Sequence, residues 1–138
     1  MKIHIIVILL MFLAPYEAFA RYLTVKHIRS LWKERMIHNT GECMSQSHVN
    51  PRVVEEFFEY GYMPHSPAWK CYLECCGREL GILSRLGDVN VQKWVDIFSY
   101  VDLPLAQECV KIEEQDVCEK AYMLLECALG ELTKLYPS

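Results

Sequence analysis

Residues 70–76, Lys-Cys-Tyr-Leu-Glu-Cys-Cys, contain three of the seven cysteines of this 138-residue chain and restrict its fold more than any other stretch. Cys71 and Cys75 are four residues apart, so on a helix they share one face with their β-carbons about 5–6 Å apart. A disulfide requires about 3.5–4.5 Å between these atoms. The two cysteines therefore need different partners, so disulfides are expected to link this segment to two other parts of the chain.

The other cysteines complete a ladder with defined spacings. The intervals between the six main cysteines are 27, 3, 33, 8 and 8 residues. Cys118 and Cys127 are nine residues apart on one expected helix, a rise of about 13 Å, so they cannot bond to each other. A ladder of this kind in a short secreted chain is typical of a disulfide framework, whose pairing these two exclusions leave open. Its six members are Cys43, Cys71, Cys75, Cys109, Cys118 and Cys127.

The first twenty residues have the pattern of a secretion signal. Lys2 precedes an apolar run over residues 3–13, and residues 18–20, Ala-Phe-Ala, form a small-x-small cleavage pattern. The run is too short for a comfortable membrane span, although an uncleaved anchor is the alternative. We therefore expect a signal peptide over residues 1–20 and a secreted, extracellular helical domain over residues 21–138.

The net charge of the chain is small and negative. The sequence contains 14 Lys and Arg and 18 Asp and Glu, which gives −4, and removal of Lys2 and Glu17 with the signal leaves that value unchanged. A mildly acidic surface with interspersed charges argues against nucleic acid as a partner. The 118 residues that remain are enough for one domain with a buried core.

Apolar residues recur at helical spacing along the mature chain, and no useful length alternates as a strand would. Asn50-Pro51 and Ser66-Pro67 each combine a capping residue with a proline at the first helical position. Glu126 is the only polar residue in the stretch 121–130, and a helix that is apolar all round is expected at the centre of its fold. The sequence predicts an all-α compact bundle of about six helices, over about 24–39, 51–60, 67–83, 91–98, 102–112 and 117–130.

The combined cysteine spacing resembles the insect odorant-binding protein family, which includes pheromone-binding proteins and general-odorant carriers. Residues 70–75 are similar to the block that carries the family's second and third cysteines. Residues 118–122 and 126–127 are similar to the block of its fifth and sixth. The resemblance covers nearly the whole mature chain. It implies helices around an apolar cavity, stapled by the disulfides Cys43–Cys75, Cys71–Cys118 and Cys109–Cys127.

Cys76 is a departure from the family pattern. It lies on the apolar stripe of its helix, one step away from the row that contains Cys71 and Cys75. Free cysteine is often buried and behaves as a small hydrophobic residue. We expect Cys76 to be a buried free thiol, with an intermolecular disulfide as the alternative.

The cavity needs apolar walls, and a residue of this kind is more often ordinary core than the wall of a ligand site. The resemblance places two wall residues near the last cysteine, Leu125 and Ala128. Tyr122 and Tyr62 are candidate hydroxyl partners for a ligand, and Leu135 and Tyr136 are candidates for a lid, with a frayed terminus as the alternative. The other expected wall residues are Trp32, Met36, Leu80, Leu83, Trp94, Phe98 and Met123.

The resemblance implies a carrier that binds and solubilises a small hydrophobic ligand, such as an odorant or pheromone, without catalysis, cofactor or metal. Delivery to a chemosensory receptor or membrane surface is expected, from a monomer or weak homodimer. The same fold also serves carriers or scavengers in saliva, haemolymph and reproductive secretions. A secreted enzyme is the remaining alternative, but Cys75-Cys76 is followed by Gly77-Arg78 rather than by a catalytic histidine, and no nucleophile–base arrangement is present.

Overall fold

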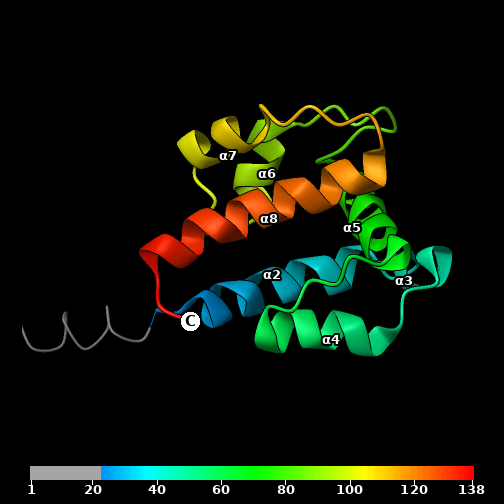
Figure 1. The fold of residues 1–138 in the computed structure, drawn as a ribbon, viewed down its shortest axis with the longest axis horizontal. Coiled ribbons are helices and arrows are strands. Elements are labelled where there is room, and N and C mark those ends of the chain that lie inside the picture. The colour runs from blue at the N-terminus through cyan, green and yellow to red at the C-terminus, as the bar shows by residue number, and fades with distance from the viewer. Residues whose placement is uncertain (1–22) are drawn as a thin grey trace, which may run out of the picture.

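The computed structural model of the protein describes residues 23–138, so the expected signal peptide lies outside the described residues. These residues form helices and no strand, apart from an isolated bridge between Leu83 and Val89 (Figure 1). The all-α prediction is confirmed. The helices are α2 (Val25–Asn39), α3 (Cys43–Ser47), α4 (Pro51–Tyr60), α5 (Pro67–Glu79), α6 (Val91–Ile97), α7 (Leu103–Cys109) and α8 (Val117–Leu135).

Helix α8 crosses the middle of the molecule, as its apolar composition predicted. In Figure 1 it runs between a layer formed by α2 and α4 and a layer formed by α6 and α7. It contacts α2, α5 and α7. The end of the chain returns to the start of α2, where the Pro137 carbonyl accepts a hydrogen bond of 2.9 Å from the Val25 amide.

The helix starts follow from capping side chains. The Asn50 and Ser66 side chains accept hydrogen bonds from the Arg52 and Trp69 amides and precede prolines at the first helical position, as predicted. Each of these bonds satisfies one of the free amides at a helix start. Thr24, Asn90, Asp102 and Asp116 cap α2, α6, α7 and α8 in the same way.

The helix ends differ more from the prediction. Helix α5 ends at Glu79 instead of continuing to residue 83, because the chain reverses at Gly81, which has a φ of 74°. Helix α7 ends at Cys109, and the amides of Lys111 and Ile112 bond three residues back in tighter turns. Helix α8 continues past residue 130 to Leu135 because its buried stripe extends to Leu132.

The short helix α3 was not predicted. Its five residues are too few to show a helical period, and it ends at Ser47, directly before His48, which has a φ of 59°. It places Cys43 fully buried against α5.

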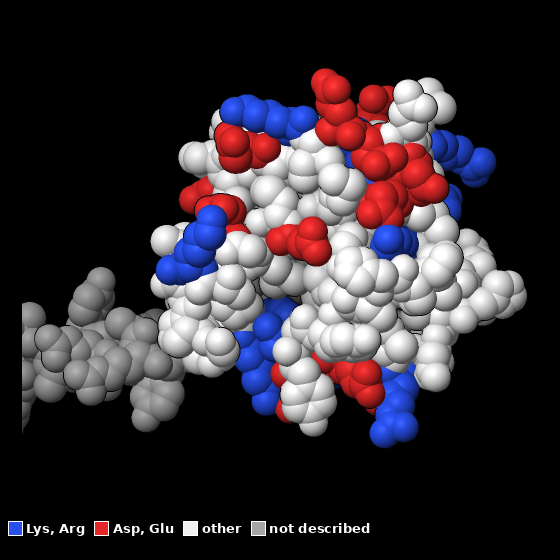
Figure 2. Space-filling model, viewed as in Figure 1, with Lys and Arg blue, Asp and Glu red and all other residues white. Residues whose placement is uncertain are grey.

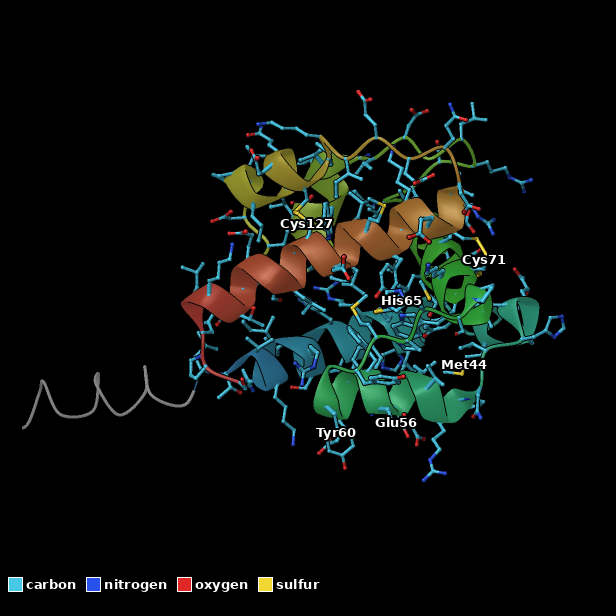
Figure 3. The ribbon with its side chains drawn as sticks, viewed as in Figure 1. Met44, Glu56, Tyr60, His65, Cys71 and Cys127 are labelled. Atoms are coloured by element: carbon cyan, nitrogen blue, oxygen red, sulfur yellow. A yellow bond between two sulfur atoms is a disulfide. The ribbon has the colours of Figure 1, made fainter. Side chains whose placement is uncertain are left out.

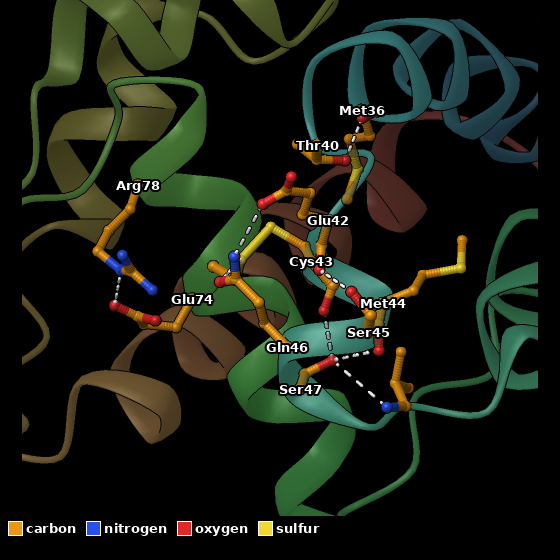
Figure 4. Close-up of a disulfide and its surroundings, with 12 residues drawn as sticks. Met36, Thr40, Glu42, Cys43, Met44, Ser45, Gln46, Ser47, Glu74 and Arg78 are labelled. Atoms are coloured by element: carbon orange, nitrogen blue, oxygen red, sulfur yellow. Dashed lines mark hydrogen bonds and ion pairs between the residues drawn. A yellow bond between two sulfur atoms is a disulfide. The ribbon is translucent and has the colours of Figure 1, made fainter.

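Three disulfides fasten the bundle, and they join the same pairs that the family resemblance implies. Cys43–Cys75 links α3 to α5, and Cys71–Cys118 and Cys109–Cys127 link α5 and α7 to α8. Figure 3 shows the bonds at Cys71 and Cys127, and Figure 4 shows the bond at Cys43. The two helices with two cysteines in the main ladder, α5 and α8, thus each reach two partners.

A buried arginine locks α2 onto α4. Arg29 on α2 donates hydrogen bonds to the carbonyls of Phe58 (3.2 Å) and Glu59 (3.3 Å) at the end of α4. Gly61 follows in a left-handed conformation, and a β-carbon there would lie 3.0 Å from the Arg29 guanidinium. Burial lowers the pKa of Arg29, and the Glu59 carboxylate partly opposes this effect. The contact completes the α2–α4 layer below α8.

Candidate functional site: an apolar cavity beside a buried thiol

An apolar cavity of about 60 Å³ lies between α2, α5, α6 and α8. Successive turns of α5 provide one wall, and the loop that follows α5 covers it. The lining residues are Met36, Leu73, Cys76, Gly77, Leu80, Ile82, Leu83, Trp94, Phe98, Leu124 and Leu125.

Gly77 allows the covering loop to fold back onto α5. A β-carbon at this position would lie 2.7 Å from Leu83 Cδ1, which is too close for two carbon atoms that are not bonded to each other. The Gly77 carbonyl also accepts hydrogen bonds from the amides of Ile82 (2.8 Å) and Leu83 (3.0 Å). The absence of a side chain at Gly77 gives the loop room to approach α5, and the hydrogen bonds to its carbonyl hold the loop over the cavity.

Aromatic rings form the wall opposite α5. Trp94 and Phe98 both line the cavity, and both are buried. Trp32 lies behind Phe98, with ring centroids 5.2 Å apart, and its indole donates a 2.8 Å hydrogen bond to the Ser99 carbonyl. This bond connects α2 to the end of α6, so the aromatic wall is fixed from behind.

Cys76 brings a weakly polar group to the cavity. The side chains of Tyr72 and Thr40 interact with its thiol, and the Thr40 hydroxyl donates a hydrogen bond to the Met36 carbonyl (Figure 4). Burial raises the pKa of the Cys76 thiol to about 11, although the bonds to Thr40 and Tyr72 oppose this. Burial also raises the pKa of Tyr72. At neutral pH this cluster is therefore uncharged.

The cavity is small in this conformation. An engineered cavity of about 150 Å³ in another protein holds benzene, and typical ligand pockets measure about 300–1,000 Å³. A fatty-alcohol or terpenoid molecule would therefore require the walls to move. Outside the helices, the wall consists of the loop over residues 80–90 and of Phe98, which directly follows α6.

Six of the predicted wall residues come together around the cavity, and four do not line it. Tyr122 is buried on another side of α8, with its ring 5.3 Å from His65 and 5.0 Å from Lys70 Nζ. Trp32 lies in the second layer, Met123 is half-buried elsewhere on α8, and Ala128 is fully buried. The six that meet are Met36, Leu80, Leu83, Trp94, Phe98 and Leu125.

The C-terminal residues lie away from the cavity. Leu135 is 72% exposed, and Tyr136 makes an edge-to-face contact with Tyr100 at 5.7 Å between centroids. Tyr62, a candidate hydroxyl partner, is exposed. Neither the predicted lid residues nor Tyr62 is among the lining residues.

Five lining residues were not predicted as wall. Leu73, Cys76 and Leu124 lie on apolar helical stripes, so their burial was visible in the sequence but their cavity position was not. Gly77 and Ile82 gave no signal, because their roles depend on the loop that returns over α5.

One part of the surface is acidic. Acidic side chains gather over the segment between α7 and α8 (Figure 2), where Glu113 and Glu114 edge an open hollow. Within residues 23–138, no group of three His, Cys, Asp or Glu side chains could hold a metal ion. No helix in that part of the chain is long and apolar enough to cross a membrane.

Comparisons with known proteins agree with the fold and the cysteine pattern. The PBP/GOBP family model matches residues 27–131. General odorant-binding protein 57e of Drosophila melanogaster is 25% identical over 91 residues, which cover 62% of this chain and 67% of that protein. No solved structure matches the chain significantly. Because the family model matches well over half of the chain and includes all three disulfides, the chain belongs to the PBP/GOBP family of insect odorant-binding proteins.

Proposed function

We propose that this protein is a secreted carrier that binds a small hydrophobic molecule in the cavity beside α5 and releases it unchanged. Membership of a binding and carrier family supports an odorant-binding role in general. The observation that carries the proposal is the cavity itself, which is lined by apolar and aromatic side chains around a single thiol. Burial of apolar ligand surface would drive binding, at about 25 cal/mol per Å².

Three disulfides support the proposal that the carrier is secreted. Such bonds persist in oxidising compartments and are rare in the cytosol. The expected signal over residues 1–20 would direct the chain there, and secretion is typical of the family. A secreted carrier of this kind would dissolve its ligand in an aqueous secretion, whether olfactory or another fluid.

The ligand class follows from the chemistry of the walls. The lining offers one weak hydrogen-bonding group, the Cys76 thiol, backed by Tyr72 and Thr40. A neutral oxygen, such as that of an alcohol or ester, can bond to this cluster without bringing a charge into the interior. Molecules of fatty-alcohol, ester or terpenoid size fit this chemistry once the loop over residues 80–90 moves outward.

A titration with the fluorescent probe N-phenyl-1-naphthylamine tests the proposal. The full chain is expressed in secreting cells, and the protein is recovered from the medium and delipidated. We expect saturable micromolar binding that dodecan-1-ol displaces. Absence of binding by a helical protein with three intact disulfides would contradict the proposal.

A matched pair of phenylalanine substitutions tests where the probe binds. Phe98→Ala removes part of the cavity wall and should weaken probe affinity by about tenfold, since contact area with the ligand is lost. Phe58→Ala removes an equally buried ring from α4, away from the cavity, and should lower stability while affinity stays unchanged. Equal affinity losses in both variants would place the binding site elsewhere.

A further inference from the structure

Tyr60, the last residue of α4, has the most exposed side chain of any tyrosine in residues 23–138. It is 77% exposed, and Figure 3 shows it at the outer edge of the molecule. Within that part of the chain, its phenol makes no hydrogen bond and no ring contact. The phenolic oxygen is therefore open to a reagent that approaches from solution.

Three carboxylates lie close before Tyr60 in the sequence. Residues 55–60 read Glu-Glu-Phe-Phe-Glu-Tyr, so Glu59 directly precedes the tyrosine and Glu56 is four residues back. Residues four apart share a face of a helix, and Figure 3 shows Glu56 and Tyr60 along the same outer side of α4. Glu55 and Glu59 are exposed as well. The acidic residues thus flank an accessible tyrosine.

The ion pairs of these carboxylates leave the flank open to another basic group. Glu59 Oε1 is 2.8 Å from Lys26 Nζ, and Glu56 Oε1 is 3.5 Å from Arg52 Nε. All four side chains are more than a third exposed, so water screens both pairs and weakens them. Among the described residues, Glu55 belongs to no ion pair.

The backbone turns away directly after Tyr60. Gly61 has a φ of 76° and ends α4, and Pro64 follows in the loop to α5. No cysteine lies between Cys43 and Cys71, so no disulfide lies next to the tyrosine in the sequence. An enzyme can therefore reach Tyr60 from the solvent side after the three disulfides have formed.

We propose that Tyr60 is a sulfation site, modified as the folded chain passes through the secretory pathway. The inference rests on the proposed secretion and goes beyond the carrier function. The phenolic oxygen attacks the sulfur of phosphoadenosine phosphosulfate, and the bond from that sulfur to the phosphate oxygen breaks. The phenolic proton passes to a base of the transferase, and phosphoadenosine phosphate leaves.

The charge of the flank favours this reaction at Tyr60. A transferase that holds an anionic phosphosulfate needs a basic cleft, and carboxylates beside the acceptor tyrosine are attracted to such a cleft. Lys26 lowers the pKa of the Glu59 carboxyl, which is therefore ionised at neutral pH. The carboxylates thus guide the tyrosine, and its own exposure presents the oxygen.

The other tyrosines of residues 23–138 lack this combination. Tyr62 is 56% exposed but has only one carboxylate within five residues, that of Glu59. Tyr100 is 43% exposed, and its ring contacts that of Tyr136. Tyr72 and Tyr122 are buried.

The fold can accept the added charge at this end of α4. A sulfate ester is anionic at every physiological pH, and a negative charge at a helix C-terminus opposes the helix dipole. Two cations lie at the same helix end, because Lys26 pairs with Glu59 and the Arg29 guanidinium donates to the Phe58 and Glu59 carbonyls. These cations offset the unfavourable position.

Metabolic labelling tests the proposal. The full chain is expressed in secreting insect cells supplied with radioactive sulfate, and the protein is recovered from the medium. We expect label on the protein and a mass increase of one sulfo group that alkaline phosphatase does not remove. Tyr60→Phe should abolish both signals, whereas the matched variant Tyr62→Phe should keep them.

A second pair of variants tests the role of the carboxylates. The combined substitutions Glu55→Gln, Glu56→Gln and Glu59→Gln should lower the label several-fold, since the basic cleft loses its attraction. The control replaces Glu108, Glu113 and Glu114 by glutamine, which removes the same charge on the far side of α8 from α4 (Figure 1). It should leave the label unchanged.

Three results would overturn the inference: no label on the secreted protein with its disulfides intact, equal label in Tyr60→Phe, or equal label in the two triple glutamine variants. If that unlabelled protein still binds N-phenyl-1-naphthylamine, only this inference falls. If the protein never reaches the medium, the proposed secretion falls and the inference falls with it.

Discussion

At the scale of single residues, Gly77 determines where the Leu83 side chain lies in the cavity wall. Gly77→Ala places a methyl group against Leu83 and forces that side chain to shift, an overpacking effect of about 1–3 kcal/mol that helix propensity offsets by about 1 kcal/mol. We expect weaker probe binding, measured by fluorescence titration, with a small loss of stability.

The control is Gly130→Ala on α8, where a new methyl meets nothing within 4 Å. It should stabilise the protein by about 0.5–1 kcal/mol and leave affinity unchanged. Unchanged probe affinity in Gly77→Ala would mean that the position of Leu83 does not affect ligand binding.

The Cys76 thiol should be unreactive in the folded protein. Its pKa of about 11, against an ordinary value of 9.0, leaves little thiolate at pH 8, and the side chain is buried. Iodoacetamide should therefore modify this thiol only after unfolding in urea, as followed by mass spectrometry. Because the folded pKa is raised, the contribution of this thiol to the free energy of unfolding should be constant below pH 9 and decrease as pH rises towards 11, which a comparison with Cys76→Ala isolates. Rapid modification of the folded protein would contradict the buried position.

The residue pattern predicted burial well. It predicted less well which of the buried side chains face the cavity. Met36, Leu80 and Phe98 were identified because helical spacing marks the inward face of a helix. Tyr122 and Ala128 lie on α8, which is buried on several sides, so periodicity does not distinguish the side towards the cavity from the side towards other helices. The position of a wall residue depends on how the helices pack together, and one sequence does not contain that information in readable form.

At the scale of elements, helix starts were predictable and helix ends were not. Caps at Asn50 and Ser66 act locally through the next two or three amides, so the sequence identifies them directly. The ends of α5 and α8 depend on what the chain meets next. In α5 a glycine turn returns the chain over the helix, and in α8 the buried stripe continues to Leu132.

The disulfides between elements should differ in their contribution to stability. Cys71–Cys118 closes 47 residues and Cys109–Cys127 closes 18, so chain entropy predicts losses of about 4 and about 3 kcal/mol when each pair is replaced by alanine. Urea unfolding of Cys71→Ala/Cys118→Ala and Cys109→Ala/Cys127→Ala measures the difference. A larger loss from the shorter loop would mean that packing between α7 and α8, rather than loop closure, determines the contribution of the bond.

At the scale of the whole molecule, the disulfide frame and the small cavity fit one account. The bonds hold α3, α5, α7 and α8 together, while the loop over residues 80–90 lies outside the helices and covers the cavity. We expect this loop to move outward when a ligand binds, while the disulfide-bonded helices stay in place. The family resemblance predicted a cavity but not its small volume, because side-chain packing decides the volume.

The central claim is that a hydrophobic ligand occupies the cavity beside α5, and a methyl NMR titration with dodecan-1-ol tests it most directly. The account predicts shifts in the methyl signals of Leu80, Leu83, Leu124 and Leu125 that saturate at one ligand per chain. Shifts confined to Val110 and Ile112 at the open surface hollow, or shifts that never saturate, would contradict it.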